Sequence, residues 1–265
     1  EIGVRLVGSE MCIRDRFTMN DYGSDGIYIT PRRVGEDGWE LSIKALIDNA
    51  DCSHKARFTL IDADGNEKAS TIADLRPIIS AKLPVENPVL WNGRKNPYLY
   101  TVRCEIFDST TQEVTDNIDI RTGLREYHID SHKGFFLNGE HIKLQGVSRH
   151  QDRENMGNAI TEKQHAEDVK IILDVGANSV RLAHYQQNSY FYDLCDESGL
   201  LVWAEVPVIS RFSPKRNENA EQQLVELIKQ NYNHPSIFCW GIENEITIAG
   251  SASKKLITFL KHMHK

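Results

Sequence analysis

The most informative run of this sequence is Asn233-His234-Pro235-Ser236-Ile237-Phe238-Cys239-Trp240-Gly241-Ile242-Glu243-Asn244-Glu245. Its middle, from Ile237 to Trp240, is short and apolar and follows a proline, which is typical of a fully buried strand. Polarity then rises sharply, because two acids and an amide follow the strand. A (β/α)8 barrel presents such strand ends at its catalytic face. For an isolated Glu-Asn-Glu the alternative is a solvated loop, but the flanking residues favour the strand.

Strands and helices alternate upstream and downstream of this run. Strand patterns lie at 142–147, 177–182 and 200–204, and helix patterns at 161–174, 189–198, 218–232 and 252–263. Thr161 is expected to cap the first helix, and Gly199 to end the second. Such alternation predicts a parallel sheet, and no glycine-rich dinucleotide fingerprint follows any strand. Since a closed barrel needs about eight strand–helix units, the four seen here predict the N-terminal half of a TIM barrel over residues 123–265.

Residues 17–122 are different, because short strands separated by turns replace the helices. Apolar and polar residues alternate from Trp39 to Ile47 and from Tyr98 to Ile106, and a further strand near Phe58 ends at a turn over residues 62–66. Repeated strands without a convincing amphipathic helix predict an immunoglobulin-like β-sandwich. Near the start of the second domain, Asn138-Gly139 predicts the turn of a β-hairpin.

Composition excludes several classes of function. The chain has 265 residues, 40% of them hydrophobic and 26% charged, which indicates a globular protein. A net charge of −7 without a basic block argues against nucleic acid as a partner, and no apolar run approaches the length of a membrane span. Five cysteines without a CxxC pair argue against a disulfide framework or a zinc site.

The first residues do not resemble a folded segment. The run Leu6-Val7-Gly8-Ser9-Glu10-Met11-Cys12-Ile13-Arg14-Asp15-Arg16 has no clear period and resembles a translated sequencing adapter. We therefore interpret residues 1–16 as a non-native scar, with an ordinary N-terminal strand or arm as the alternative. On this hypothesis the native protein extends upstream, and its compartment, bacterial cytoplasm or periplasm, stays open.

The opening run also carries a family resemblance. Asn-His-Pro-Ser-Ile followed by Trp-Gly-Ile-Glu-Asn-Glu resembles the acid/base signature of glycoside hydrolase family 2, which contains β-galactosidases, β-glucuronidases and β-mannosidases. The resemblance implies that Glu245 is the general acid/base and that Asn244 binds the sugar 2-hydroxyl. It extends from about Gly26 to the C-terminus and includes the aromatic residues Trp91 and Tyr98, which we expect to be packing residues of the sandwich rather than a sugar platform.

Two further motifs match the family. Gly146-Val147-Ser148-Arg149-His150 and Arg181-Leu182-Ala183-His184-Tyr185 imply that His150 and His184 bind sugar hydroxyls, although Gln186 stands where the family usually has a proline. Arg181 either binds substrate or pairs with a carboxylate. Glu205 is expected to be a supporting charge and Glu243 a structural residue.

The position of these residues supports one site. His150, the pair Arg181 and His184, Glu205, and Asn244 with Glu245 each follow a different predicted strand. Because all carboxyl ends of barrel strands meet at one face, we expect these side chains to surround a single pocket. The alternatives for the individual residues are a loop histidine at position 150 and charges without a common site.

The motifs of the two histidine loops resemble galactosidases more than glucuronidases. The resemblance thus implies that the intact parent hydrolyses terminal β-D-galactosides with retention, taking a β-galactoside or an oligosaccharide as substrate. The alternatives are a β-glucuronidase, a β-mannosidase, a non-catalytic carbohydrate-binding module or an unrelated α/β enzyme. Neither nucleic acid nor a membrane is an expected partner, and the parent's oligomeric state, monomer or homo-oligomer, stays open.

The resemblance also bears on cofactors and activity. Some relatives bind magnesium through a carboxylate and a histidine in the loop after the third strand, where this chain has Val208-Ile209-Ser210-Arg211. No metal or other cofactor is therefore expected. In the family the catalytic nucleophile follows a later strand, so we expect this chain alone to have no appreciable glycosidase activity.

Overall fold

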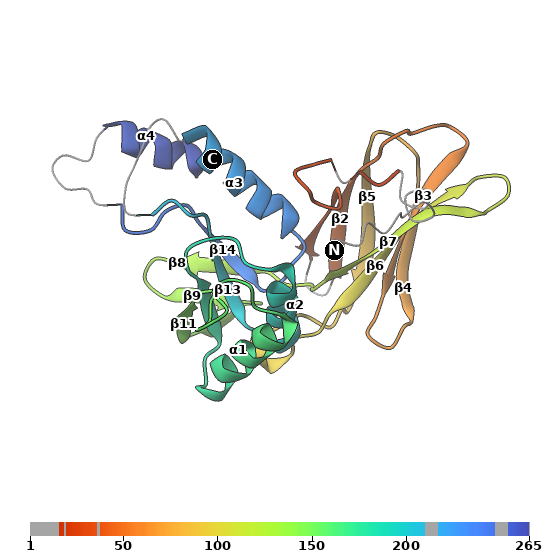
Figure 1. Ribbon diagram of the computed structural model, residues 1–265. Helices are drawn as coiled ribbons and strands as arrows, with labels where there is room; N and C mark the ends of the chain where they lie inside the picture. The colour runs from red at the N-terminus through yellow and green to blue at the C-terminus, as the bar shows by residue number, and fades with distance from the viewer. Residues whose placement is uncertain (1–15, 19, 36–37, 210–216, 247–253, 265) are drawn as a thin grey trace. The chain divides into compact units, whose positions relative to one another are not determined.

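The computed structural model describes residues 16–18, 20–35, 38–209, 217–246 and 254–264 (Figure 1). Its contacts divide the chain into two compact units: residues 1–89 with 99–124, and residues 90–98 with 125–265. Of the predicted scar over residues 1–16, only Arg16 lies within the described residues. Among the described helices, none has both the length and the apolarity that crossing a membrane requires.

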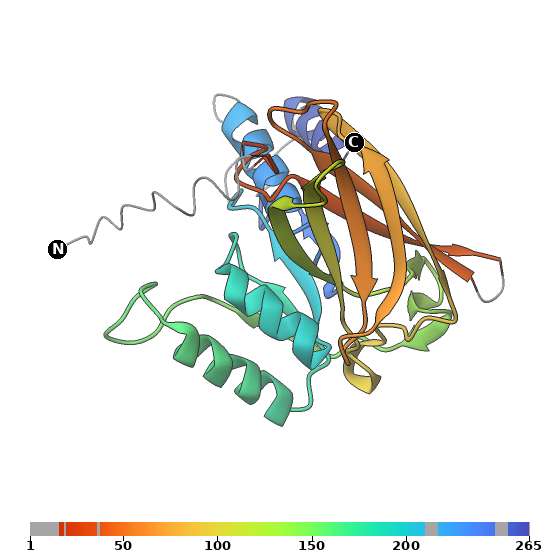
Figure 2. The same cartoon turned by 90° about the vertical axis from the view of Figure 1, so that its right-hand side faces the viewer.

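The first unit is the predicted immunoglobulin-like sandwich, which the structure confirms. All its strand pairs are antiparallel, and Figure 2 shows the long strands. One sheet has the order β1-β2-β5, formed by Ile27–Val34, Gly38–Leu46 and Ile78–Glu86. The other has the order β4-β3-β6-β7, formed by Glu67–Asp74, His54–Ile61, Tyr100–Asp108 and Val114–Thr122.

The alternation of β2 shows why these strands form. Trp39, Leu41, Ile43 and Ala45 are buried, whereas the residues between them are partly or fully exposed. A strand points successive side chains to opposite faces, so this sequence buries one face and leaves the other more accessible. β3 and β6 bury alternate apolar residues in the same way.

The second unit begins with a three-stranded hairpin sheet. Its strands are β8 (Tyr127–Asp130), β9 (Gly134–Leu137) and β10 (Glu140–Ile142), in the order β10-β9-β8. The turn between β9 and β10 is the predicted one. Asn138 and Gly139 both have positive φ, 51° and 82°, as a type I′ hairpin turn requires. This unit also contains the short 3-10 helix η1 (Gly93–Lys95).

A parallel sheet follows, in chain order β11-β12-β13-β14. Its strands are Gly146–Arg149, Ser179–Leu182, Leu201–Glu205 and Ile237–Gly241, and its helices are α1 (Glu162–Asp174), α2 (Ser189–Ser198), α3 (Asn217–Gln230) and α4 (Lys254–Met263). Neighbouring parallel strands joined by helices confirm the predicted partial TIM barrel. The predicted strand over 142–147 is wrong in its bounds, because Ile142 pairs with Phe135 in the hairpin and β11 begins only at Gly146.

The helix ends follow the sequence. Thr161 and Gln164 form a capping box at the start of α1, and Gly199 ends α2 in the left-handed region at φ 72°. A side chain at position 199 would meet the backbone of Gly93 at 2.3 Å, so this glycine permits both the turn and a close approach.

The two faces of the parallel sheet differ. Val180, Leu182, Val202 and Ala204 pack in one apolar core with buried residues of all four helices. Because side chains alternate along a strand, Arg181, Trp203 and Glu205 lie on the opposite face, which lines the interior in a closed barrel. Trp203 is 39% exposed there. The alternation therefore separates a structural face from one available for chemistry.

Candidate active site

Glu205 lies at the centre of the polar residues that follow the parallel strands. It is the last residue of β13 and is 0% exposed. Arg181 Nε donates to its Oε1, and His184 Nδ1 lies 2.7 Å from its Oε2. The strand beside it makes room: a Cβ on Gly241 would lie 2.5 Å from the Glu205 Cγ. Two cationic or polar donors thus surround one buried carboxylate, as a buried charge requires.

Arg181 extends this cluster to the strand end of the acid/base motif. Its Nη2 donates to Asn244 Oδ1 at 2.8 Å and lies 3.4 Å from His184 Nδ1. The Asn244 backbone N–H donates to Val208 O at 2.8 Å, which holds this residue, only 6% exposed, beside the loop after β13. Of the two roles left open for Arg181, the structure shows the carboxylate pair.

The two histidines of the family motifs are neighbours. The ring centroids of His150 and His184 are 5.5 Å apart in an edge-to-face arrangement, and the ring of Tyr185 lies 6.1 Å from that of His150. His150 is exposed, whereas His184 is partly buried. The structure therefore brings together four of the five predicted site residues, His150, Arg181, His184 and Asn244.

Glu245, the fifth, follows Asn244 at the carboxyl end of β14 and is exposed. Its backbone lies in the left-handed region, at φ 50°. Within the described part of the chain, its carboxylate makes no hydrogen bond or ion pair. Beside it, Glu243 Oε2 accepts from the Ile246 N–H at 3.2 Å, which fits the structural role expected of Glu243.

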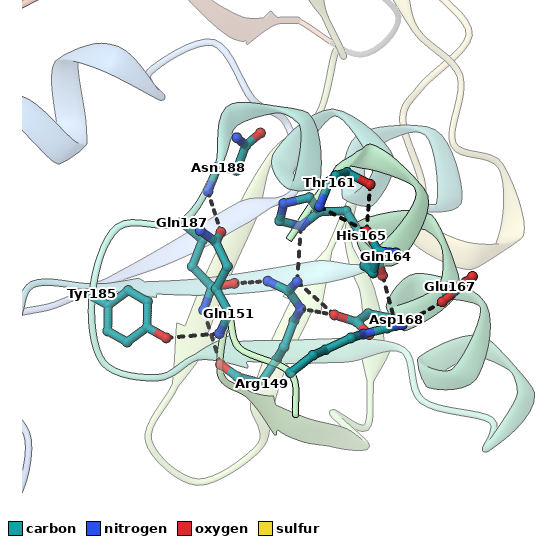
Figure 3. A network of polar contacts seen from close by, with 11 residues as sticks. Arg149, Gln151, Thr161, Gln164, His165, Glu167, Asp168, Tyr185, Gln187 and Asn188 are labelled. Carbon is teal, nitrogen blue, oxygen red and sulfur yellow. Dashed lines mark hydrogen bonds and ion pairs between the residues drawn. The ribbon is translucent and has the colours of Figure 1, made fainter. Parts of the chain in front are cut away.

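The arginine of the first histidine motif has a role that the sequence did not reveal. Arg149 is buried and points toward the helices, where its guanidinium contacts Asp168, His165 and Gln187 (Figure 3). Nε and Nη2 donate to Asp168 Oδ2 at 3.0 and 2.7 Å, Nη2 lies 3.0 Å from His165 Nδ1, and Nη1 donates to Gln187. The guanidinium also lies 3.9 Å above the ring centroid of Phe191. Burial, assisted by the Arg149 charge, lowers the pKa of His165.

The same network ties together the loops that carry the histidines (Figure 3). The Gln151 N–H donates to the Tyr185 hydroxyl at 2.9 Å, and the Asn188 N–H donates to Gln151 Oε1 at 2.8 Å. Gln187 Nε2 donates back to the Arg149 carbonyl at 3.1 Å. Because His150 and His184 sit at the base of these loops, the network limits how far the two rings can move apart.

One group of potential metal ligands occurs among the described residues: Asp193, Asp196 and His234, whose ligand atoms lie within 4.8 Å of one another. Both Asp196 oxygens already have partners, since His234 Nδ1 lies 2.6 Å from Oδ2 and the Ser236 N–H donates to Oδ1 at 3.0 Å. The group fits a hydrogen-bonded link between α2 and the start of β14 better than a cation site. In the loop after β13, Ser210 and Arg211 lie outside the described residues.

Comparison with known proteins gives the same family along nearly the whole chain. The profile "Glycosyl hydrolases family 2" matches residues 25–125, and "Glycosyl hydrolases family 2, TIM barrel domain" matches residues 129–265. A β-glucuronidase of Bacteroides fragilis is 37% identical over 98% of this chain and 39% of its own length. A β-galactosidase of Thermoanaerobacter pseudethanolicus is 31% identical over 84% of this chain and 31% of its own length.

Solved structures agree with the fold. The crystal structure of an FMN-binding β-glucuronidase from Faecalibacterium prausnitzii L2-6 has a TM-score of 0.88 and 39% identity, covering 95% of this chain and 39% of that chain. The chain thus spans well under half the length of these relatives, at 39% for the Bacteroides protein.

Proposed function

The chain belongs to glycoside hydrolase family 2, and we propose that its parallel sheet carries the acid/base half of a retaining β-glycosidase site, with Glu245 as the general acid/base. The observation that supports this most is the hydrogen-bonded chain from His184 through Glu205 and Arg181 to Asn244. It joins three strand ends beside Glu245. Such convergence at the carboxyl ends of barrel strands is where catalysis occurs in this architecture.

The proposed roles follow from the polarity of each group. Arg181 occupies Asn244 Oδ1, so the amide NH2 of Asn244 is the part left to donate to a sugar hydroxyl. The paired imidazoles of His150 and His184 add further hydrogen-bonding atoms at the same sheet end. Hydrogen bonds to the sugar 2-hydroxyl that strengthen in the transition state contribute several kcal/mol to glycoside hydrolysis.

For the substrate we propose a β-D-glucuronoside. Among the curated relatives, a β-glucuronidase is 37% identical over 98% of the chain, whereas two β-galactosidases are 31% identical over 84% and 36% identical over 58% of it. The galactoside expected from the two loop motifs is therefore the second candidate.

The nucleophile has to be a second carboxylate, about 5–5.5 Å from the acid/base in a retaining enzyme. Glu205 does not suit this role, because both of its oxygens are engaged by Arg181 and His184. Glu243 is engaged in the turn at Ile246. We therefore propose that this chain alone does not turn over aryl glycosides.

A chimera tests the proposal. This chain would replace the matching segment of the Bacteroides fragilis β-glucuronidase, and hydrolysis of the 4-nitrophenyl β-D-glucuronide, galactoside and mannoside would be compared. We expect the glucuronide to react fastest. Glu245→Gln should lower kcat about 100-fold to 10,000-fold, the range for a lost general acid/base. A 2,4-dinitrophenyl glycoside, whose leaving group needs little protonation, should lose much less in its glycosylation step.

Glu243→Gln is the matched control, since it removes a neighbouring carboxylate that we place in the turn. If both variants lose the same activity on both leaving groups, Glu245 is not the acid. If the galactoside reacts faster than the glucuronide in the chimera, the substrate assignment is wrong while the catalytic one stands.

A further inference from the structure

We propose that Glu205 is a positioning residue that fixes the proton of His184 on Nδ1 and so leaves Nε2 as the atom that faces a sugar hydroxyl. The assignment of a sugar ligand rests on the proposed function, but the placement of the proton does not. The observation behind it is the buried cluster in which one carboxylate meets both the guanidinium of Arg181 and the imidazole of His184.

Glu205 can only accept hydrogen bonds in this cluster. Its side chain is fully buried, and Arg181 Nε donates to Oε1. A guanidinium has donors and no acceptor, and its charge stabilises the ionised carboxylate beside it. Glu205 is therefore present as a carboxylate, with Oε2 as the atom available to the histidine.

The ring of His184 meets this carboxylate through Nδ1. Its Nδ1 lies 2.7 Å from Glu205 Oε2, a distance typical of a hydrogen bond to a charged acceptor. Since the carboxylate has no proton to give, Nδ1 must carry it. Arg181 Nη2, at 3.4 Å from the same Nδ1, cannot donate to a protonated nitrogen, and it donates to Asn244 instead.

Nε2 of His184 remains available to a ligand. In neutral imidazole one nitrogen donates and the other accepts, and the hydrogen bond at one sets the role of the other. With Nδ1–H held by Glu205, Nε2 of neutral His184 is an acceptor. Among the described residues, nothing donates to Nε2. His184 then accepts a hydroxyl proton from the sugar, whereas Asn244 donates to a hydroxyl oxygen.

Nitrogen NMR of the ¹⁵N-labelled 265-residue chain tests this directly. On the alkaline side of the ring's own titration, followed in the same spectra, we expect the His184 ring to show a protonated Nδ1 and a bare Nε2. The His184 signals are identified by their loss in His184→Gln. A bare Nδ1 in the wild-type chain would overturn the proposal, whatever any variant does.

Glu205→Gln supplies the second arm. The glutamine Oε1 has to accept from Arg181, so its NH2 faces Nδ1 of His184 and demands an acceptor there. The ring should therefore switch to the Nε2–H form, exchanging the shifts of the two nitrogens. Glu205→Asp, which keeps a carboxylate, should retain Nδ1–H wherever it contacts the ring. An unchanged His184 in folded Glu205→Gln would show that other groups place the proton.

Two histidines of the same chain are internal references. His234 Nδ1 lies 2.6 Å from Asp196 Oδ2 and should be in the Nδ1–H form, whereas His165 Nδ1 accepts from Arg149 at 3.0 Å and should be in the Nε2–H form. Neither should change in Glu205→Gln, so a change confined to His184 distinguishes positioning from general loosening. Absence of glycoside binding would refute the proposed function but leave this result intact.

Discussion

At the scale of single residues, the backbone of Glu245 is unusual. It has φ 50°, in the left-handed region that residues with a side chain rarely adopt. Holding such a conformation costs on the order of 1–3 kcal/mol, and these conformations cluster at functional sites. Glu243, which accepts from the backbone of Ile246, is one contact that supports the turn. Stability is thus given up at the position where we place the acid.

This strain leads to a prediction about two variants that both lose the carboxylate. Glu245→Gly should be more stable than Glu245→Ala by about 1 kcal/mol, because glycine adopts positive φ without a steric penalty. The free energy of unfolding in urea, measured by circular dichroism, checks the order. An alanine variant as stable as the glycine variant would show that the turn relaxes to an ordinary conformation.

At the scale of elements, the end of α2 depends on Gly199. This residue has φ 72°, and a Cβ there would lie 2.3 Å from the Gly93 backbone. Gly199→Ala should therefore cost more than the roughly 1–2 kcal/mol of a left-handed alanine alone. Gly176→Ala is the matched control, since φ is 82° but nothing lies within 4 Å of the new Cβ. Equal losses in urea unfolding would mean that the approach of Gly93 is not constrained.

The junction of β11 with α1 predicts a pH dependence. Burial and the charge of Arg149 lower the pKa of His165, so the folded chain resists protonation that the unfolded chain accepts near pH 6.5. Stability from this group is complete above that pH and is lost as the pH falls from about 6.5 toward the lower folded value, by at most about 1.4 kcal/mol per pH unit.

His165→Gln should reduce this loss, because glutamine still offers Arg149 an acceptor but does not titrate. The measurement is the urea midpoint between pH 7.5 and pH 5 for the wild type and the variant. His132→Gln, at an exposed position, is the control. If the variant and the wild type lose stability in parallel, protonation of His165 does not couple to folding.

The sandwich strands that the sequence predicted individually have a strong burial pattern. β2 alternates buried and accessible residues along its length, whereas β4 was missed and contains no fully buried residue. Periodicity reports burial, so a strand at the surface carries little signal. The same limit explains the strand predicted over 142–147, where neighbouring apolar residues belong to two different elements.

The sequence predicted which residues gather at the candidate site, but not which hydrogen bonds join them. The positions of His150, His184 and Asn244 after separate strands indicated a common location. Glu205 contacts both Arg181 and His184. These contacts depend on the path of the loop after β12, which no local sequence pattern encodes. Likewise, Arg149 stands next to His150 in its motif yet points to the other face of the sheet, where it contacts Asp168.

At the scale of the whole molecule, two buried thiols report on the two units separately. Cys104 lies in β6 of the sandwich and Cys195 in α2 of the second unit, and burial raises the pKa of both. Because the thiolate is the reactive form, both should resist iodoacetamide in the native chain, whereas the exposed Cys52 should react.

In graded urea we expect Cys195 to become reactive before Cys104. We base this order on the face of the parallel sheet opposite the helices, where Trp203 is 39% exposed, because apolar side chains left in water contribute less to stability than buried ones. Pulsed alkylation with mass spectrometry measures each site. A single midpoint for both thiols would indicate that the two units unfold as one.

The short segment 90–98 belongs by its contacts to the second unit, although it lies within the sandwich part of the sequence. Trp91 is fully buried there, its Nε1 donates to the Asp196 carbonyl at 2.9 Å, and the Asn138 side chain bonds its carbonyl at 3.0 Å. The sequences of the two units are therefore interleaved, and the units cannot be exchanged independently at one point in the chain. A single crossover near residue 124 that replaced the sandwich would also replace the loop that contains Trp91. A recombinant that folds should therefore take residues 90–98 from the same parent as its second unit.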